Sequence, residues 1–491
     1  MIISLYLIGF CTCAFYLHFV YRNWQYLKFS WQVKNGFWYP ILPLVGTTYV
    51  SLFAESKNII SLMQWIDKIK GFPFNLWYGD TYMYITKDPK EVKTIVNHPK
   101  CVNKAPLYDK FRFIFEHSII LVQDETWRKQ RKHFVMGFKS SILKNNIYIY
   151  YNHSCQLVED LKSVKMPKDI FRYCDRYAVQ SFFLGNTGIS QYLSSNEVEK
   201  VGDVILDIQD LIKSLVVTPF LSPKLFLTYF PAGKKVTKML QEAKEIVRYG
   251  IGHKKNLLKE QSEYLENGKD LLELCLDYGK DDLDDNKIIQ QVELFASAAS
   301  DTAGHTLAFT FVLLGMHQEI QEKVYEEVME VVGDKDITHQ DLPNLKYTEA
   351  VICETLRLFP IIPTLGRRCD EDINLGTKII PKGSSCIISI FHVQRDPKYW
   401  PDPLKFDPSR FLPENQSKIN QFSWIGFSAG LRDCLGKAQG LAMIKVTVAN
   451  VVRNFKIASD HKSIEEFTLT SCLTMTPKEN LDCRFSAREK L

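Results

Sequence analysis

The stretch that most constrains this chain is Phe427–Gly436, which reads Phe-Ser-Ala-Gly-Leu-Arg-Asp-Cys-Leu-Gly. Cys434 lies between two glycines, and the apolar run from Leu435 to Val452 contains no proline, which predicts a helix just after the cysteine. The unpaired N–H groups at a helix N-terminus favour a thiolate over a thiol. Arg432 adds a bidentate cation that suits a carboxylate. Together these features suggest a haem iron bound by Cys434, with a haem propionate on Arg432.

Five positions of this loop resemble the haem-binding signature of the cytochrome P450 family: Phe427, Gly430, Arg432, Cys434 and Gly436. Gly430 can take the positive φ that a tight loop needs, and Gly436 lets a flat ligand approach the backbone. The resemblance implies a mainly α protein with a smaller β region, in a cytochrome P450-like fold. The alternative is a buried cysteine in an ordinary turn. Matches to the family elsewhere in the chain are needed to choose between a haem ligand and a structural cysteine.

The composition allows one large catalytic unit. The chain has 491 residues, 46% of them hydrophobic, and no Pro/Gly/Ser-rich linker or internal repeat divides it; length alone permits about two to four domains. The net charge of +5 is mild and gives no reason to expect a nucleic-acid partner. The twelve cysteines are scattered without a CxxC pair, which indicates mostly buried free thiols in a reducing compartment.

Residues 1–21 carry no charged side chain and match the ~20 residues that a membrane-spanning helix needs. The cations Arg22, Lys28 and Lys34 follow, and such cations tend to stay on the cytosolic side. A cleaved signal peptide is the alternative, but neither a basic start nor a small-residue cleavage site is evident. We therefore expect a single transmembrane anchor over 1–21, a basic and proline-containing linker over 22–46, and a catalytic domain over 47–491.

A basic helical segment, Glu125–His133, places Trp127 and Arg131 four residues apart on one face. An indole N–H beside a guanidinium can bind an anionic group such as the second propionate, and the pair resembles the WxxxR element of the family. The other cations of the segment form either a solvated face or a docking patch for an acidic electron donor. They are Arg128, Lys129 and Lys132.

Residues 286–315 contain no proline and are apolar, which predicts one helix of about 45 Å at ~1.5 Å per residue. Glu293 and Asp301 would be expensive in a bilayer, so a buried core helix fits better than a second membrane span. An acid beside a hydroxyl can relay protons, and Asp301 with Thr302 resembles the oxygen-activation motif of the family. The alternative is a threonine bonded to its own helix beside a satisfied aspartate.

Three residues depart from the family pattern. The family usually has glycine at Ala299, where the helix loosens to admit oxygen. The related branch often has glutamate at Ala298, which can bond covalently to the haem; alanine cannot, so we expect haem b that is non-covalent apart from the Cys434–iron bond. The family often has histidine at Gln394, and His392, two residues earlier, is the candidate replacement.

Glu354 and Arg357 lie three residues apart in the predicted helix Tyr347–Phe359 and share one face. Buried charges need partners, so Arg410 in the later segment Phe406–Phe411 could join them. The group resembles the ExxR motif of the family and its later arginine. The resemblance implies a structural network that supports the loop under the haem.

Arg367 follows a proline-marked turn and matches the position of another propionate-binding cation in the family; a surface arginine is the alternative.

The sequence also predicts a β-hairpin shortly after Arg367 and a β-strand near the start of the catalytic domain. Residues 376–390 resemble a hairpin that turns at Pro381–Gly383. Tyr82–Thr86 alternates and predicts a short strand, after which Asp88 caps a helix with Pro89 at its first position.

These motifs occur in the order of the family, at matching separations, over nearly the whole chain. Gln318–Glu327 and Phe406–Glu414 look most like the fatty-acid ω-hydroxylase branch and its insect relatives. The resemblance implies an animal microsomal type in the endoplasmic reticulum membrane, in contact with membrane lipid and with the catalytic domain facing the cytosol. It also implies NADPH–cytochrome P450 reductase and cytochrome b5 as candidate electron donors.

The implied activity is that of a haem-thiolate monooxygenase that inserts one atom of O2 into a lipophilic substrate such as a fatty acid, hormone or xenobiotic. One alternative is a haem-thiolate isomerase or dehydratase that acts on a peroxide without a reductase, which would need neither Asp301 and Thr302 nor the basic face. Another is a non-catalytic lipophile-binding haem protein in which Ala299 blocks oxygen. The substrate itself is not readable from the motifs.

Overall fold

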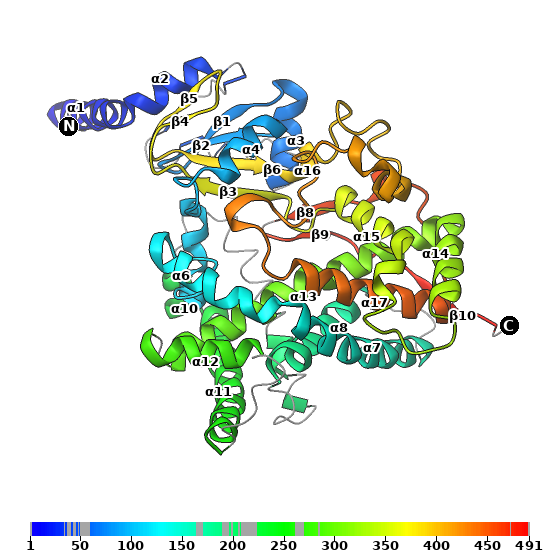
Figure 1. Ribbon diagram of the computed structural model, residues 1–491. Coiled ribbons are helices and arrows are strands. Elements are labelled where there is room, and N and C mark those ends of the chain that lie inside the picture. The colour runs from blue at the N-terminus through cyan, green and yellow to red at the C-terminus, as the bar shows by residue number, and fades with distance from the viewer. Residues whose placement is uncertain are drawn as a thin grey trace.

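The computed structural model describes residues 2–33, 35–36, 41–42, 46–47, 49, 59–163, 170–188, 196–197, 200–204, 207, 223–260, 270–282, 285–471 and 473–489. Much of the proline-containing end of the expected linker, and the expected cation Lys34, lie outside these residues. The described part is mainly helical with a smaller β region, as predicted (Figure 1).

The helices precede, surround and follow the strands in the sequence. They are α1 (Ile2–Arg22), α2 (Trp24–Gln32), α3 (Ile59–Ile69), α4 (Pro89–Asn97), α5 (Arg112–Phe115), α6 (Asp124–Phe134), α7 (Ser140–Ser163), α8 (Ile170–Phe182), α10 (Pro223–Tyr229), α11 (Pro231–Glu260), α12 (Leu271–Asp282), α13 (Asp285–Met316), α14 (Gln318–Val331), α15 (Lys346–Leu358), α16 (Ile390–Val393) and α17 (Lys437–Asn454).

The strands are short and come from distant parts of the chain. They are β1 (Phe74–Tyr78), β2 (Thr81–Thr86), β3 (Thr364–Arg368), β4 (Ile373–Asn374), β5 (Ile379–Ile380), β6 (Ser385–Ser389), β7 (Phe455–Ala458), β8 (Leu469–Ser471), β9 (Met475–Pro477) and β10 (Arg484–Ala487).

The main sheet has the order β1-β2-β6-β3, and β6 lies in its interior, parallel to β2 and antiparallel to β3. The expected hairpin through Pro381–Gly383 is wrong, because β5 pairs with β4 instead. All five residues of β6 are buried. Strands buried on both faces suit the middle of a sheet, so β6 pairs with strands that are distant in sequence rather than with its neighbour.

Helix α13 runs through the helical part of the molecule and packs against α8, α17 and α15 (Figure 1). It is one unbroken helix over Asp285–Met316, which confirms the predicted core helix. Gly304 lets α8 approach closely, because a Cβ there would lie 2.7 Å from the Cα of Asp175. The predicted helices at α6, α15 and α17, the strand β2 and the Asp88 cap of α4 are also confirmed.

The predicted membrane anchor has no support from this structure. Residues 2–22 do form a helix, α1, but among the described residues none of the helices is long and apolar enough to cross a membrane. The last turn of α1 is occupied by contacts with the protein: Phe19 is buried, and its ring centroid lies 5.6 Å from that of Trp77 in β1. A helix is therefore present where the anchor was predicted, but the prediction that it spans a membrane is not supported.

The predicted free thiols are confirmed for the described cysteines. All of them are free, and most are buried. Cys434 is an exception, because its side chain is exposed.

Candidate functional site

A cavity of about 410 Å³ is lined by the Cys434 loop, α13, α6 and the turn between β8 and β9. Cys434, Asp301 and Thr302 therefore share one cavity although they are far apart in the sequence. Aromatic and aliphatic side chains form most of the remaining wall. They include Tyr108, Phe111, Phe115, Ile119, Phe295, Ile361, Ile362, Leu365 and Leu473.

The Cys434 loop is fixed by its backbone. Gly430 has φ +74°, and a Cβ there would lie 2.1 Å from the carbonyl oxygen of Val96, so an L residue would be both strained and obstructed. The Cys434 N–H donates to the Phe427 carbonyl over 3.0 Å. Gly436 caps α17, and a Cβ there would make an ordinary van der Waals contact, 3.6 Å from Cε1 of Phe138.

Two opposing effects act on the pKa of the Cys434 thiol. The sulfur is open to the cavity, but the protein packed around it displaces bulk water, and this desolvation raises the pKa above its usual value, while the hydrogen bond from the Gly436 N–H offsets the rise only in part. The helix terminus thus acts in the predicted direction, since the Gly436 N–H lowers the pKa of the thiol, but desolvation outweighs it. A thiol loses its proton when it binds a metal ion, so the sulfur remains suited to ligation.

Three cations lie close together, and two of them, Lys104 and Arg432, line the cavity. The third, Arg367, is buried and is not among the lining residues. The pKa of Lys104 is well below its usual value because of burial and the nearby Arg367 and Arg432. Burial and the neighbouring Arg367 also lower the pKa of Arg432 to about 9. Among the described residues, no partner is found for Arg367 Nη2 or Arg432 Nε, both of which are buried.

These cations fit the two carboxylates of a haem. Arg432 donates to the carbonyls of Ile120 and Val122 over 3.2 and 2.6 Å, which fixes its guanidinium beside the cavity. Lys104 lines the cavity and forms an isolated β-bridge with Arg367. An anion placed here would relieve the mutual repulsion of the three cations and satisfy their free N–H groups. Sequence reasoning missed Lys104, because the bridge that places it joins two distant segments.

Trp127 and Arg131, expected to bind one anionic group together, contact different partners. The guanidinium of Arg432 lies over the Trp127 ring, 4.6 Å from its centroid. Arg131 donates to the Asp433 carbonyl over 2.7 Å and also pairs with the Asp433 carboxylate. Both residues line the cavity, but Arg131 is neutralised by Asp433. On this side of the cavity, Arg432 is therefore better placed than Arg131 to bind an anionic ligand.

The acid–alcohol pair faces the cavity from α13. Thr302 Oγ1 donates to the Ala298 carbonyl over 2.7 Å, the bond to its own helix that was the alternative interpretation. Asp301 is buried and accepts a hydrogen bond of 3.1 Å from Thr474 Oγ1, in the turn between β8 and β9. Ala299 lies within unbroken helix. Thr474 was not predicted, since no local pattern marks it.

The structure brings the predicted Glu–Arg–Arg group together. Glu354 and Arg357 are fully buried, and their bidentate contacts measure 2.6 and 2.8 Å. Arg410 Nε lies 3.5 Å from Glu354 Oε1. The remaining Arg357 donors bind backbone carbonyls, including Pro403 at 2.7 Å, so the group pins the chain that leads to the Cys434 loop.

Gln394 connects this group to the loop. Its amide donates to the carbonyl of Leu356 over 2.8 Å, and its oxygen accepts from the Ile425 N–H over 2.8 Å. His392 does not take part, because its Nδ1 pairs with Ser389 Oγ at 2.7 Å. The departure at Gln394 therefore leaves a working brace between α15 and the loop.

Comparison with known proteins gives the same picture. A family model described as Cytochrome P450 matches residues 39–484. The chain is 29% identical over 456 residues to "Cytochrome P450 4c21" of Blattella germanica, covering 86% of this chain and 87% of that protein. It is 28% identical over 517 residues to "Cytochrome P450 4c3" of Drosophila melanogaster, covering 93% and 96%. The expected similarity to insect relatives is thus confirmed, and the chain belongs to the cytochrome P450 family.

Proposed function

We propose that this protein uses a haem held by Cys434 to insert one atom of O2 into a lipophilic substrate, with electrons from NADPH. The observation that carries the proposal is the cavity, where an accessible sulfur, a group of uncompensated cations and the pair Asp301 and Thr302 meet in an apolar enclosure. The isomerase and carrier alternatives give no role to that pair.

The haem, when bound, would supply the oxygen chemistry and the one-electron steps. We propose haem b without a covalent bond to the protein other than that of Cys434 to the iron, because Ala298 has no group that could form one. Arg432, Arg367 and Lys104 would hold the propionates. Trp127 supports Arg432 through its ring face, a cation–π contact.

The remaining parts of the cavity handle protons and substrate. Asp301 would pass protons to Thr302, whose hydroxyl has to turn away from the Ala298 carbonyl to donate into the cavity. The aromatic and aliphatic wall would exclude water and hold an apolar C–H bond near the reacting centre. A fatty acid, a hormone or a xenobiotic each satisfies this wall.

Electron delivery would use the basic face of α6. Arg128, Lys129 and Lys132 are exposed there, and a cationic patch attracts an acidic partner. We propose NADPH–cytochrome P450 reductase as that partner, with cytochrome b5 as a second donor. The division at residue 46 stays a prediction from the sequence, and the placement at the endoplasmic reticulum membrane with a cytosolic catalytic domain stays a prediction from the sequence and the resemblance.

Replacing Cys434 by alanine tests the ligand. The Cys434→Ala protein should lose the red-shifted Soret band of its reduced carbon-monoxide complex, because that shift requires a thiolate on the iron. Cys155→Ala, which changes a half-buried cysteine on α7, is the matched control and should keep the band. Retention of the band in Cys434→Ala would refute the proposed ligation.

A further inference from the structure

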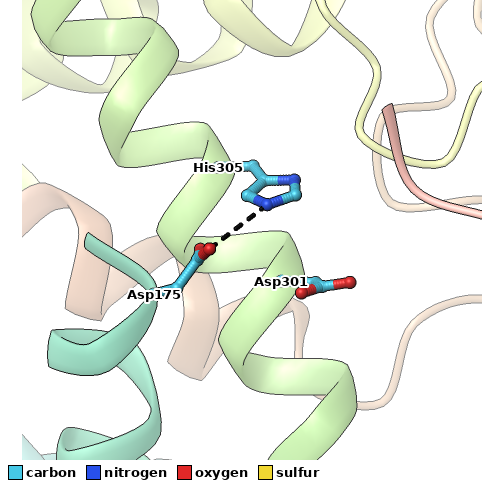
Figure 2. A group of neighbouring side chains, drawn as sticks. All are labelled: Asp175, Asp301 and His305. Carbon is cyan, nitrogen blue, oxygen red and sulfur yellow. Dashed lines mark ion pairs between the residues drawn. The ribbon is translucent and has the colours of Figure 1, made fainter. Parts of the chain in front are cut away.

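A buried group of three titratable side chains lies behind the cavity. Asp175 of α8 and Asp301 and His305 of α13 place one ligand-type atom each within 4.8 Å of the others (Figure 2). His305 Nε2 is 3.4 Å from Asp175 Oδ2, and both side chains are nearly inaccessible, at 3% and 10% exposure. The close approach of α8 at Gly304 makes this contact possible.

The surroundings of His305 determine its protonation. Its Nδ1 lies 3.2 Å from the Met475 carbonyl oxygen, and its Nε2 faces the Asp175 carboxylate. Both partners accept hydrogen bonds, but a neutral imidazole carries only one N–H. An imidazolium has two and satisfies both acceptors. In addition, two buried carboxylates this close repel each other, and a cation within 4.8 Å of both offsets that repulsion.

We propose that His305 is a protonated positioning residue, whose imidazolium is the counter-charge that holds the Asp301 carboxyl group directed at the cavity. The inference rests on the proposed role of Asp301 in proton relay. The facing groups are Asp175 from α8, Asp301 from α13 and the Met475 carbonyl from β9, with the Phe171 ring 5.5 Å away. Thr474, which binds Asp301, precedes Met475, so one short segment aligns both α13 side chains.

The first test is the pH dependence of unfolding of the haem-loaded protein and its His305→Gln variant. A histidine that is protonated in the folded state and has a pKa of ~6.5 when unfolded stabilises the protein fully below about pH 6.5. That contribution is lost as the pH rises further. The difference in unfolding free energy between the wild type and His305→Gln should therefore shrink from pH 6 to pH 9.

His392→Gln is the matched control, since His392 is also buried but burial lowers its pKa to about 3. Its contribution has the opposite sign: it is full above about pH 6.5 and is lost as the pH falls toward 3, because the unfolded chain binds the proton more readily. A difference for His305→Gln that stays constant from pH 6 to pH 9, or that behaves like that of His392→Gln, would overturn the proposal.

The second test is the product formed per NADPH consumed. We expect His305→Gln to lower this ratio about ten-fold and release hydrogen peroxide instead, while its carbon-monoxide spectrum stays normal. The loss should be smaller than the ~100-fold or more that removal of a proton donor costs, because Asp301 itself remains. His305→Lys, which keeps the charge, should recover part of the ratio, and His392→Gln should leave it unchanged.

Asp301→Asn separates the two hypotheses. If Asp301→Asn forms as much product per NADPH as the wild type, the proposed proton relay itself is refuted. If Asp301→Asn forms much less product per NADPH and His305→Gln forms as much as the wild type, only the proposed role of His305 is refuted. A divalent metal ion that survives dialysis of the wild type and is absent from His305→Gln would also overturn the inference, because the three side chains would then form a metal site.

Discussion

Gly430 shows how much of the proposed haem site depends on a single residue. Its positive φ turns the loop so that Cys434 opens into the cavity, and its missing Cβ leaves room for the Val96 carbonyl. The local signature revealed this position because the constraint is carried by the residue itself. The positions of Lys104, Thr474 and Asp175 depend instead on segments that fold against each other, and no neighbouring residues mark them.

Replacing Gly430 by alanine should destabilise the protein by about 3 kcal/mol and lower its haem content, because the new Cβ is strained and meets a backbone oxygen. Chemical unfolding and the ratio of Soret to protein absorbance measure both effects. Gly252→Ala is the control: nothing lies within 4 Å of its Cβ in the interior of α11, so stability should rise by about 1 kcal/mol. Equal effects of the two substitutions would contradict this account.

Helices were easier to predict than strands. The helices α4, α13 and α17 were predicted from the Asp88–Pro89 start of α4 and from apolar runs without proline in α13 and α17, signals that lie within the helices themselves or directly beside them. The hairpin at Pro381–Gly383 failed because β6 pairs with β2 and β3, and pairing across such distances leaves no local trace. The ExxR group was predictable in part, since α15 itself sets the Glu354–Arg357 spacing.

At this scale, Glu354→Gln should reduce the unfolding free energy by about 3 to 5 kcal/mol, because it leaves the buried Arg357 without its counter-charge. Denaturant titration measures the loss, and haem content should fall with it as the Cys434 loop loosens. Glu322→Gln changes an equivalent pair with Arg488 whose carboxylate is 47% exposed, and should cost less than about 1 kcal/mol. A similar cost at both sites would show that burial is not what makes the ExxR pair matter.

The whole molecule brings together Lys104 and Arg432, which line the cavity, and the buried Arg367, all from distant segments. The fold class could be predicted from the order of the motifs, whereas this convergence could not, since it exists only after the sheet and the loop have assembled. Without an anion, the folded chain bears the repulsion of these cations. The haem-free and haem-loaded forms therefore respond in opposite ways when one cation is removed.

Lys104→Met should raise the unfolding free energy of the haem-free protein by about 1 kcal/mol and weaken haem binding about ten-fold, since a hydrogen bond to a charged group contributes ~1.5 kcal/mol. Because the pKa of Lys104 is lowered on folding, the unfolded wild type binds the extra proton. Its haem-free stability should thus rise with pH up to about 10.4, and the variant should lack this rise. Unfolding curves and haem titrations measure these effects.

Lys90→Met, which removes an exposed lysine from α4, should change neither quantity. An unchanged haem affinity in Lys104→Met would exclude this lysine from the propionate site.

The segment from Leu473 to Met475 has one further consequence. Leu473 lines the cavity wall, Thr474 holds Asp301, and the Met475 carbonyl holds His305. If the protein has the proposed function, this one segment would affect both which compounds enter the cavity and how much product forms per NADPH consumed. A substitution selected because it admits a new compound would then also change that ratio.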